Sequence, residues 1–253
     1  MSVVEQKKER IRFALQELDY PTSVLRTSEA MSTLNDDIGM SDSFEEIDGF
    51  IGDFVGDDDF KEVIFSAHVI QAVMDVAQDN KSYPLTFYGS ACSVLYYLCY
   101  KNTELATTFV ENGGAEFLLE TLEDFSSNQP LLLACFALHR AIIETLDGNE
   151  RESFAAMTLE MLLEVAELNS ESADERFYQY YCVAVMNSFR PGLDLRVDKR
   201  CYHRTVHFVW RGLFKQECDD KIQVGGHAVL CYLVGNERAK KMIDNAAMDH
   251  CYD

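Results

Sequence analysis

Apolar residues recur with a helical period along most of the chain. From Phe60 onward they return every three or four positions, and no run shows the two-residue alternation of a half-buried strand. Only four prolines interrupt the 253 residues. This pattern predicts an all-α fold. A separate helix is predicted over about 4–18, where Ile11, Leu15 and Leu18 form one apolar stripe.

The helical segments repeat one another. The segment ACSVLYYL (91–98) matches ACFALHRA (134–141) in its Ala, Cys and Leu positions, and YCVAVMNS (181–188) and GHAVLCYL (226–233) keep parts of the pattern. The four starting positions differ by 43, 47 and 45 residues. A period of this length predicts stacked helical units, because a single unit cannot bury its own apolar face.

One unit carries a more specific pattern, TELATTFVENGGAEFLLETLEDFSSNQPLLLACFALHRAI (103–142). A short helix over Thr103 to Glu111 ends at Asn112-Gly113-Gly114, and a second helix follows over Ala115 to Glu123. A third helix has Pro130 in its first turn and runs to about Glu144. In this order the unit resembles an armadillo repeat. The resemblance implies a right-handed α-solenoid of about four armadillo-like repeats.

The resemblance also divides the chain. It implies a repeat domain over 60–253, preceded by an N-terminal helix within 1–20 that could cap the stack and by a segment over 21–59. The approximate repeat bounds are 60–101, 102–147, 148–190 and 191–248.

The segment over 21–59 is strongly acidic. The chain has 22 Lys and Arg against 43 Asp and Glu, a formal net charge of −21, and Glu29 to Asp59 holds eleven carboxylates without one Lys or Arg. We expect this acidic, Ser/Thr-containing segment to be flexible because its charges repel one another. Thr33 and Ser43 each stand three residues before an acidic residue, an arrangement that makes them candidate phosphorylation sites.

The same charge bears on partners and location. A strongly acidic chain is a poor nucleic-acid ligand, so we expect no nucleic-acid partner. The longest uncharged window, Ser82 to Tyr100, is too polar for a membrane span, and the amino terminus has no secretory signal. We therefore expect no membrane contact, a cytoplasmic or nuclear location, and reduced cysteines.

Candidate chemistry is sparse. Cys92, Cys135 and Cys182 recur at one repeat position, which favours core packing, and the chain contains no CxxC. His203 and His207 share one helix face but lack the third ligand of a zinc site. No nucleophile accompanies His139. We expect no metal, no cofactor and no catalytic residues.

The family resemblance also implies a partner-binding groove. Armadillo third helices carry an Asn whose amide binds the backbone of an extended peptide. The matching positions here are Tyr97, Arg140, Asn187 and Tyr232, and the neighbouring Trp position of the family is occupied by Ser93, Phe136, Val183 and Ala228. Only one of the four Asn positions is Asn, so the implied groove differs in chemistry from that of the family.

We therefore expect a non-catalytic scaffold that binds a protein partner with a basic or mixed-charge, or an extended, segment. Tyr and Arg are enriched at interface hot spots, and Arg140 could anchor a carboxylate. A co-chaperone of the nucleotide-exchange type, acting on a heat-shock chaperone, is one alternative, and a metal-dependent enzyme of unrecognised type is another. Partner identity and oligomeric state stay open.

Overall fold

The computed structural model describes residues 3–19, 23–38, 66–79, 83–172, 175–188 and 199–215, with 227, 229–231 and 233–234. Within these ranges every regular element is a helix, which confirms the all-α prediction. The helices are α1 (Val3–Asp19), α2 (Val24–Ile38), α5 (Ala67–Asp79), α6 (Leu85–Cys99), α7 (Thr103–Glu111), α8 (Gly114–Asp124), α9 (Gln129–Thr145), α10 (Gly148–Leu168), α11 (Glu175–Ser188) and α12 (Lys199–Lys215). No helix in the described ranges is long and apolar enough to cross a membrane.

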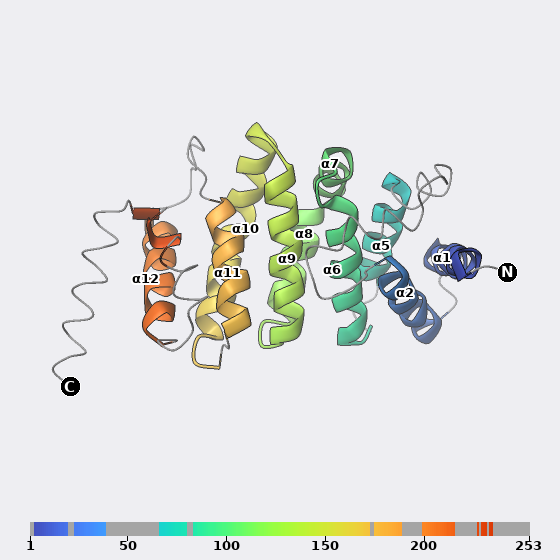
Figure 1. Ribbon diagram of the computed structural model, residues 1–253, viewed down its shortest axis with the longest axis horizontal. Coiled ribbons are helices and arrows are strands. Elements are labelled where there is room, and N and C mark those ends of the chain that lie inside the picture. Colours follow the sequence, from blue (N-terminus) through green and yellow to red (C-terminus); the bar gives the residue numbers. More distant parts are fainter. Residues whose placement is uncertain are drawn as a thin grey trace.

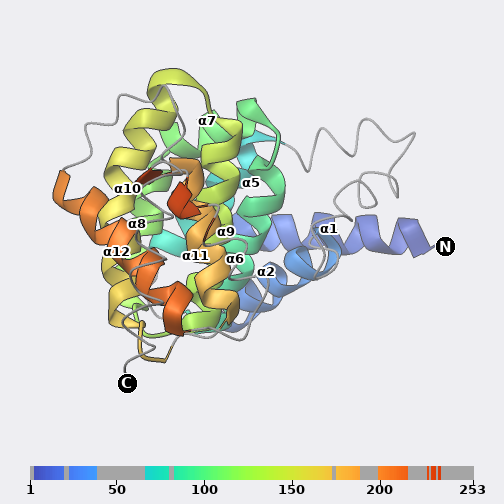
Figure 2. The ribbon, with the colours of Figure 1, turned by 60° about the vertical axis from the view of Figure 1, so that its left-hand side comes forward.

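The helices stand in two adjoining rows. In one row α2 contacts α6, α6 contacts α9, and α9 contacts α11 (Figure 1). In the other row α5 contacts α8, α8 contacts α10, and α10 contacts α12. Figure 2 shows α8, α10 and α12 on one side and α6, α9 and α11 on the other. A single apolar cluster running from Ile11 to Leu230 lies between them.

Local sequence signals account for the best-defined unit. The side-chain oxygen of Asn102 caps α7 by accepting from the Leu105 N–H at 3.2 Å, and Asn128 caps α9 by accepting from the Leu131 N–H at 3.0 Å. Gly113 has a φ of +85° between α7 and α8, a conformation that glycine adopts without steric cost. The predicted boundaries of these three helices agree with the structure to within one residue.

Contacts between neighbouring units have the same spacing as the sequence repeat. Five contacts join residues 43 or 44 positions apart. The contacts are Cys92 Sγ with Cys135 Sγ (3.9 Å), Lys101 N with Thr145 Oγ1 (2.9 Å), Thr107 Oγ1 with Glu150 Oε2 (3.0 Å), Ser126 O with Asn169 Nδ2 (2.6 Å), and Gln129 Nε2 with Ser172 Oγ (2.9 Å). Matching positions of successive units therefore touch one another.

The amino-terminal part corrects one expectation. Val24–Ile38 is a helix, α2, so the prediction of a flexible 21–59 segment is wrong for these residues. Met31 and Leu34 are fully buried, and Ser23 Oγ accepts from the Arg26 N–H at 3.3 Å at the start of the helix. Burial of this apolar stripe favours a helix despite the acidic composition. Residues 39–65 lie outside the described ranges.

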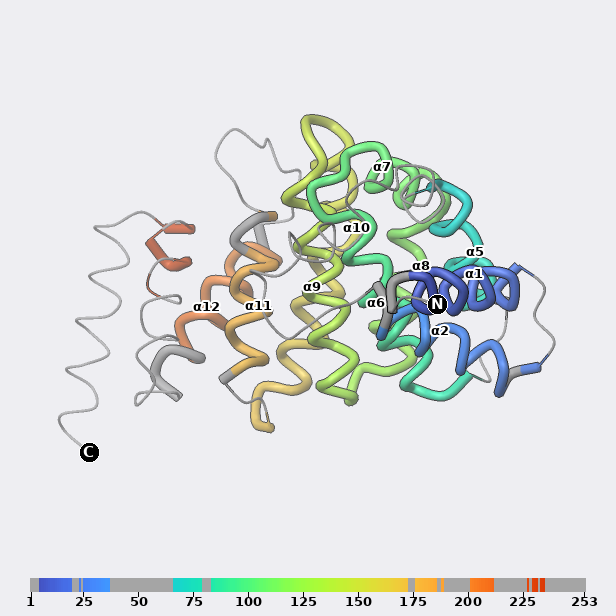
Figure 3. The backbone as a smooth tube through the Cα atoms, turned by 45° about the vertical axis from the view of Figure 1, so that its right-hand side comes forward, coloured from blue at the N-terminus to red at the C-terminus, as the bar shows by residue number. Residues whose placement is uncertain are grey.

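Helix α1 contacts both α2 and α5 (Figure 3). Its side chains Ile11, Ala14 and Leu18 are buried. At the end of the helix, Asp19 Oδ1 lies 2.9 Å from His68 Nε2 of α5. Helix α1 thus covers the first helices of both rows.

Candidate functional site

Helix α9 offers solvent only a narrow strip. Beyond Pro130 none of its side chains is fully exposed, because α6 and α11 flank it. Half-buried side chains recur three or four positions apart at Leu133, Ala137, Arg140 and Glu144, which places them on one face. Half-buried side chains of α6 and α11 continue the row on either side. We call the half-buried residues of these three helices the α6–α9–α11 strip.

Four of the predicted partner-binding residues lie in this strip. Ser93, Tyr97, Arg140 and Val183 are each half-buried. The Ser93 hydroxyl donates to the Gly89 carbonyl at 3.0 Å, and the Tyr97 ring meets the Tyr96 ring edge-on at 5.2 Å between centroids.

Of the remaining four predicted positions, three lie outside what the structure describes and one is buried. The side chain of Asn187, on α11, and the residues Ala228 and Tyr232 lie outside what the structure describes. The prediction that Phe136 lines a groove is wrong, because Phe136 is fully buried. Its ring packs against the rings of Phe177 and Tyr181, at 5.2 and 5.8 Å between centroids. Phe136 is therefore part of the core between α9 and α11.

Arg140 already has a carboxylate partner. Its Nε donates to Glu144 Oε1 at 2.8 Å, one helical turn further along α9. A ligand carboxylate would thus compete with Glu144 for the guanidinium. Nearby, burial raises the pKa of Tyr96, and Tyr100 adds to the effect, so the phenol stays neutral.

Charge is distributed unequally between the helices. Helices α6, α9 and α11 together carry two basic and two acidic side chains. Helices α7, α8 and α10 together carry eleven carboxylates and one arginine, Arg151. The acidity of the repeat region therefore belongs to helices that lie beside the strip, while the strip itself is close to neutral.

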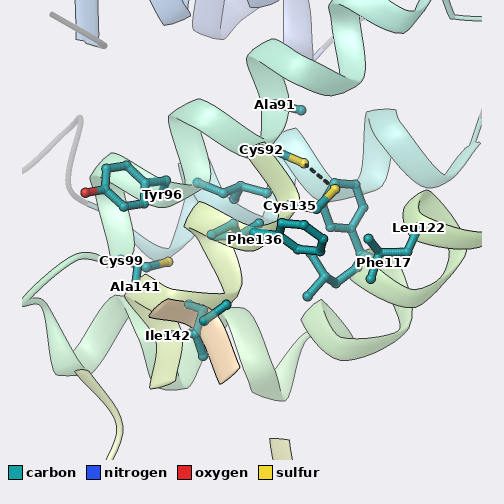
Figure 4. Packing of buried hydrophobic residues seen from close by; sticks show 14 of the residues in the cluster. Ala91, Cys92, Tyr96, Cys99, Phe117, Leu122, Cys135, Phe136, Ala141 and Ile142 are labelled. Carbon is teal, nitrogen blue, oxygen red and sulfur yellow. Dashed lines mark hydrogen bonds between the residues drawn. The ribbon is translucent and has the colours of Figure 1, made fainter. Parts of the chain in front are cut away.

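The cysteines are core residues in the structure. Cys92 and Cys135 are fully buried, with their sulfur atoms 3.9 Å apart (Figure 4). Burial raises the pKa of Cys182 to about 12, and the contact with Cys92 together with burial raises the pKa of Cys135. Thiols held protonated in this way are poor nucleophiles and poor metal ligands.

His139 is neutral and structural. It is fully buried, and burial lowers its pKa to about 3. The Thr158 hydroxyl donates to the Phe154 carbonyl at 2.8 Å, so His139 Nε2–H donates to Thr158 Oγ1 at 3.0 Å. This hydrogen bond joins α9 to α10 and leaves no accessible base.

The remaining candidate positions that the structure describes are not brought together into a site. His203 and His207 are exposed on α12, whereas Cys201 is buried. In the described part of the chain, no three His, Cys, Asp or Glu side chains gather as metal ligands. Thr33 is half-buried within α2, and Ser43 lies outside the described residues.

Sequence reasoning missed some members of the strip. Four half-buried members of the strip were not among the predicted partner-binding residues, namely Leu133, Ala137, Glu144 and Tyr180. They stand three or four residues from predicted positions, and residues at that spacing share a helix face. The sequence could therefore have predicted them. Comparisons with protein-family models, with curated proteins and with solved structures give no match.

Proposed function

We propose that this chain is a non-catalytic interaction scaffold, an armadillo-like solenoid of about four repeats that binds a protein partner on the α6–α9–α11 strip. The observation that carries the proposal is the set of contacts between residues 43 or 44 positions apart, since a solenoid stacks equivalent positions of successive units. Such stacking leaves a continuous surface across several units for a partner.

The composition of the strip supports a partner of mixed charge. Tyr97 and Tyr180 offer large amphipathic rings, and Arg140 and Glu144 offer one charge of each sign. A partner segment that presents apolar side chains and polar backbone would fit this surface. The carboxylates of α7, α8 and α10 would attract a basic partner over a longer range and speed its encounter.

Affinity purification with matched variants tests the proposal. The wild-type chain, Tyr97→Ala and Glu164→Ala would be expressed in the native cell and their bound proteins quantified by mass spectrometry. Glu164 is exposed on α10, so its truncation is the control. We expect at least one protein to be lost with Tyr97→Ala and kept with Glu164→Ala. Identical sets for all three chains would refute binding at the strip, provided that circular dichroism shows all three to be folded.

A further inference from the structure

Helix α12 differs in charge from the rest of the molecule. In a chain of net charge −21, its seventeen residues contain five Lys or Arg and two His, and no Asp or Glu. The described helices include no other with such an excess of basic residues.

One side of α12 packs against α10 and α11 of the same chain. Val206, Phe208 and Val209 are buried, and the Phe208 ring packs against Tyr178 and Tyr181 of α11, at 5.4 and 4.8 Å. Arg204 binds Glu167 of α10 through two hydrogen bonds, the shorter being 2.6 Å. The helix is therefore held firmly, with one arginine committed to α10.

The opposite side of α12 presents a stripe of two histidines and one arginine to solvent. His203, His207 and Arg211 are exposed and stand four residues apart, so they follow one face over about 12 Å. Among the residues that the structure describes, none of the three forms an ion pair. The rings of Tyr202 and Trp210 lie beside the two histidines, at 5.7 and 5.8 Å. The fold does not need this stripe for its own packing.

We propose that the His203–His207–Arg211 stripe is a second interaction surface, which binds an acidic helical segment of a partner protein. Carboxylates one helical turn apart on such a segment would match the spacing of the stripe. Within this chain, α12 already pairs with helical carboxylates, since Arg204 contacts Glu160 and Glu167 of α10. Tyr202 and Trp210 add the aromatic area typical of interface hot spots. Because α12 is already docked, little ordering would oppose binding.

The surroundings of the stripe favour a short acidic segment over a nucleic acid or an anionic membrane. Glu160 and Glu164 are exposed on α10, which contacts α12. A phosphate backbone or a lipid surface would extend past the stripe and meet these carboxylates, whereas a short helix could end within it. The proposal does not depend on the α6–α9–α11 strip.

Fluorescence anisotropy with a labelled probe tests the proposal on the full chain. The probe is a short helical peptide with Glu at positions i, i+4 and i+8, and its reference carries Gln at these positions. The test variant combines His203→Ala, His207→Ala and Arg211→Ala. The control variant combines Arg10→Ala, Arg12→Ala and Arg26→Ala, three exposed arginines of α1 and α2.

We expect the wild-type chain to bind the Glu peptide in preference to the Gln peptide at low ionic strength. The α12 variant should bind it about tenfold more weakly, whereas the α1–α2 variant and Tyr97→Ala should bind it as the wild type does. Equal binding of the two peptides, or unchanged binding by the α12 variant, would overturn the proposal. So would tighter binding of a single-stranded oligouridylate or of phosphatidylserine vesicles that is lost in the same variant. Circular dichroism verifies that each variant is folded.

Discussion

Gly89 and Gly114 illustrate how differently two helical glycines can be used. A Cβ added at Gly89, in the middle of α6, would have nothing within 4 Å, whereas one added at Gly114 would lie 2.3 Å from the Phe109 ring. Phe109 is fully buried, so its ring has little room to move. Gly114 thus allows α7 and α8 to pack closely, while Gly89 has no such role within the chain.

The two glycines give opposite predictions for alanine substitution. Gly89→Ala should raise the free energy of unfolding by about 0.5–1 kcal/mol, because alanine loses less backbone entropy in a helix. Gly114→Ala should lower it by about 1–3 kcal/mol through overpacking against Phe109. Urea denaturation monitored by circular dichroism measures both. A destabilising Gly89→Ala would show that its surroundings are not open.

His139 predicts a dependence of stability on pH. Its pKa is about 3 in the folded chain and near 6.5 when unfolded, so below pH 6.5 the unfolded state binds the additional proton. The stability that comes from keeping His139 neutral is fully present above pH 6.5 and is lost as the pH falls towards 3. Each fall of one pH unit within that window lowers the free energy of unfolding by about 1.4 kcal/mol.

His139→Gln isolates the effect, because Gln can still donate to Thr158 but does not ionise. Between pH 6.5 and pH 5 the wild type should lose about 2 kcal/mol more than this variant in urea titrations. The carboxylates titrate in both chains, so they cancel in the difference. Parallel losses in the two chains would contradict the buried, neutral state of His139.

At the level of single residues, the sequence predicted some of the strip but not all of it. The repeat alignment placed Ser93, Tyr97, Arg140 and Val183 on half-buried positions. It could not distinguish these from Phe136, which lies one residue from Ala137 of the strip but points between α9 and α11. Aligned positions share a helix face only approximately, because each residue turns the helix by about 100°. A shift of one residue can therefore move a side chain from the surface to the core.

At the level of elements, α2 shows where charge misled the prediction. Its carboxylates favoured a flexible segment, but Thr27, Ala30, Met31 and Leu34 form a buried stripe with helical spacing. Helix α2 packs against both α1 and α6. Composition alone could not reveal this, because the cost of ordering acidic residues is offset only by burial against another helix.

Two leucine truncations should distinguish the faces of α2. Leu34→Ala should destabilise the chain by about 2–5 kcal/mol, because Leu34 is fully buried. Leu25→Ala, in the same helix, should have an effect within about 0.5 kcal/mol, because Leu25 is 69% exposed. Denaturant unfolding measures the two free energies. If Leu34→Ala left the transition unchanged, α2 would not be part of the cooperatively folded unit.

Across the whole molecule, the net charge of −21 is distributed unequally over three groups of helices. The carboxylates gather on α7, α8 and α10, five basic residues lie on α12, and the α6–α9–α11 strip is nearly neutral. The period of the sequence repeat is close to the 43 or 44 residues that separate contacting positions in the described helices. The charge of each segment can be read from the sequence, whereas the side-by-side order of the helices in the two rows comes from the structure.

The central claim is that a partner protein contacts the α6–α9–α11 strip, and site-specific photo-crosslinking in the native cell tests it most directly. A photoreactive residue would be placed at Ser93 in the strip or at Glu120, which is exposed on α8. We predict one or more proteins crosslinked from position 93 and absent from position 120. No crosslinked protein at position 93, or the same proteins at both positions, would contradict the proposed function.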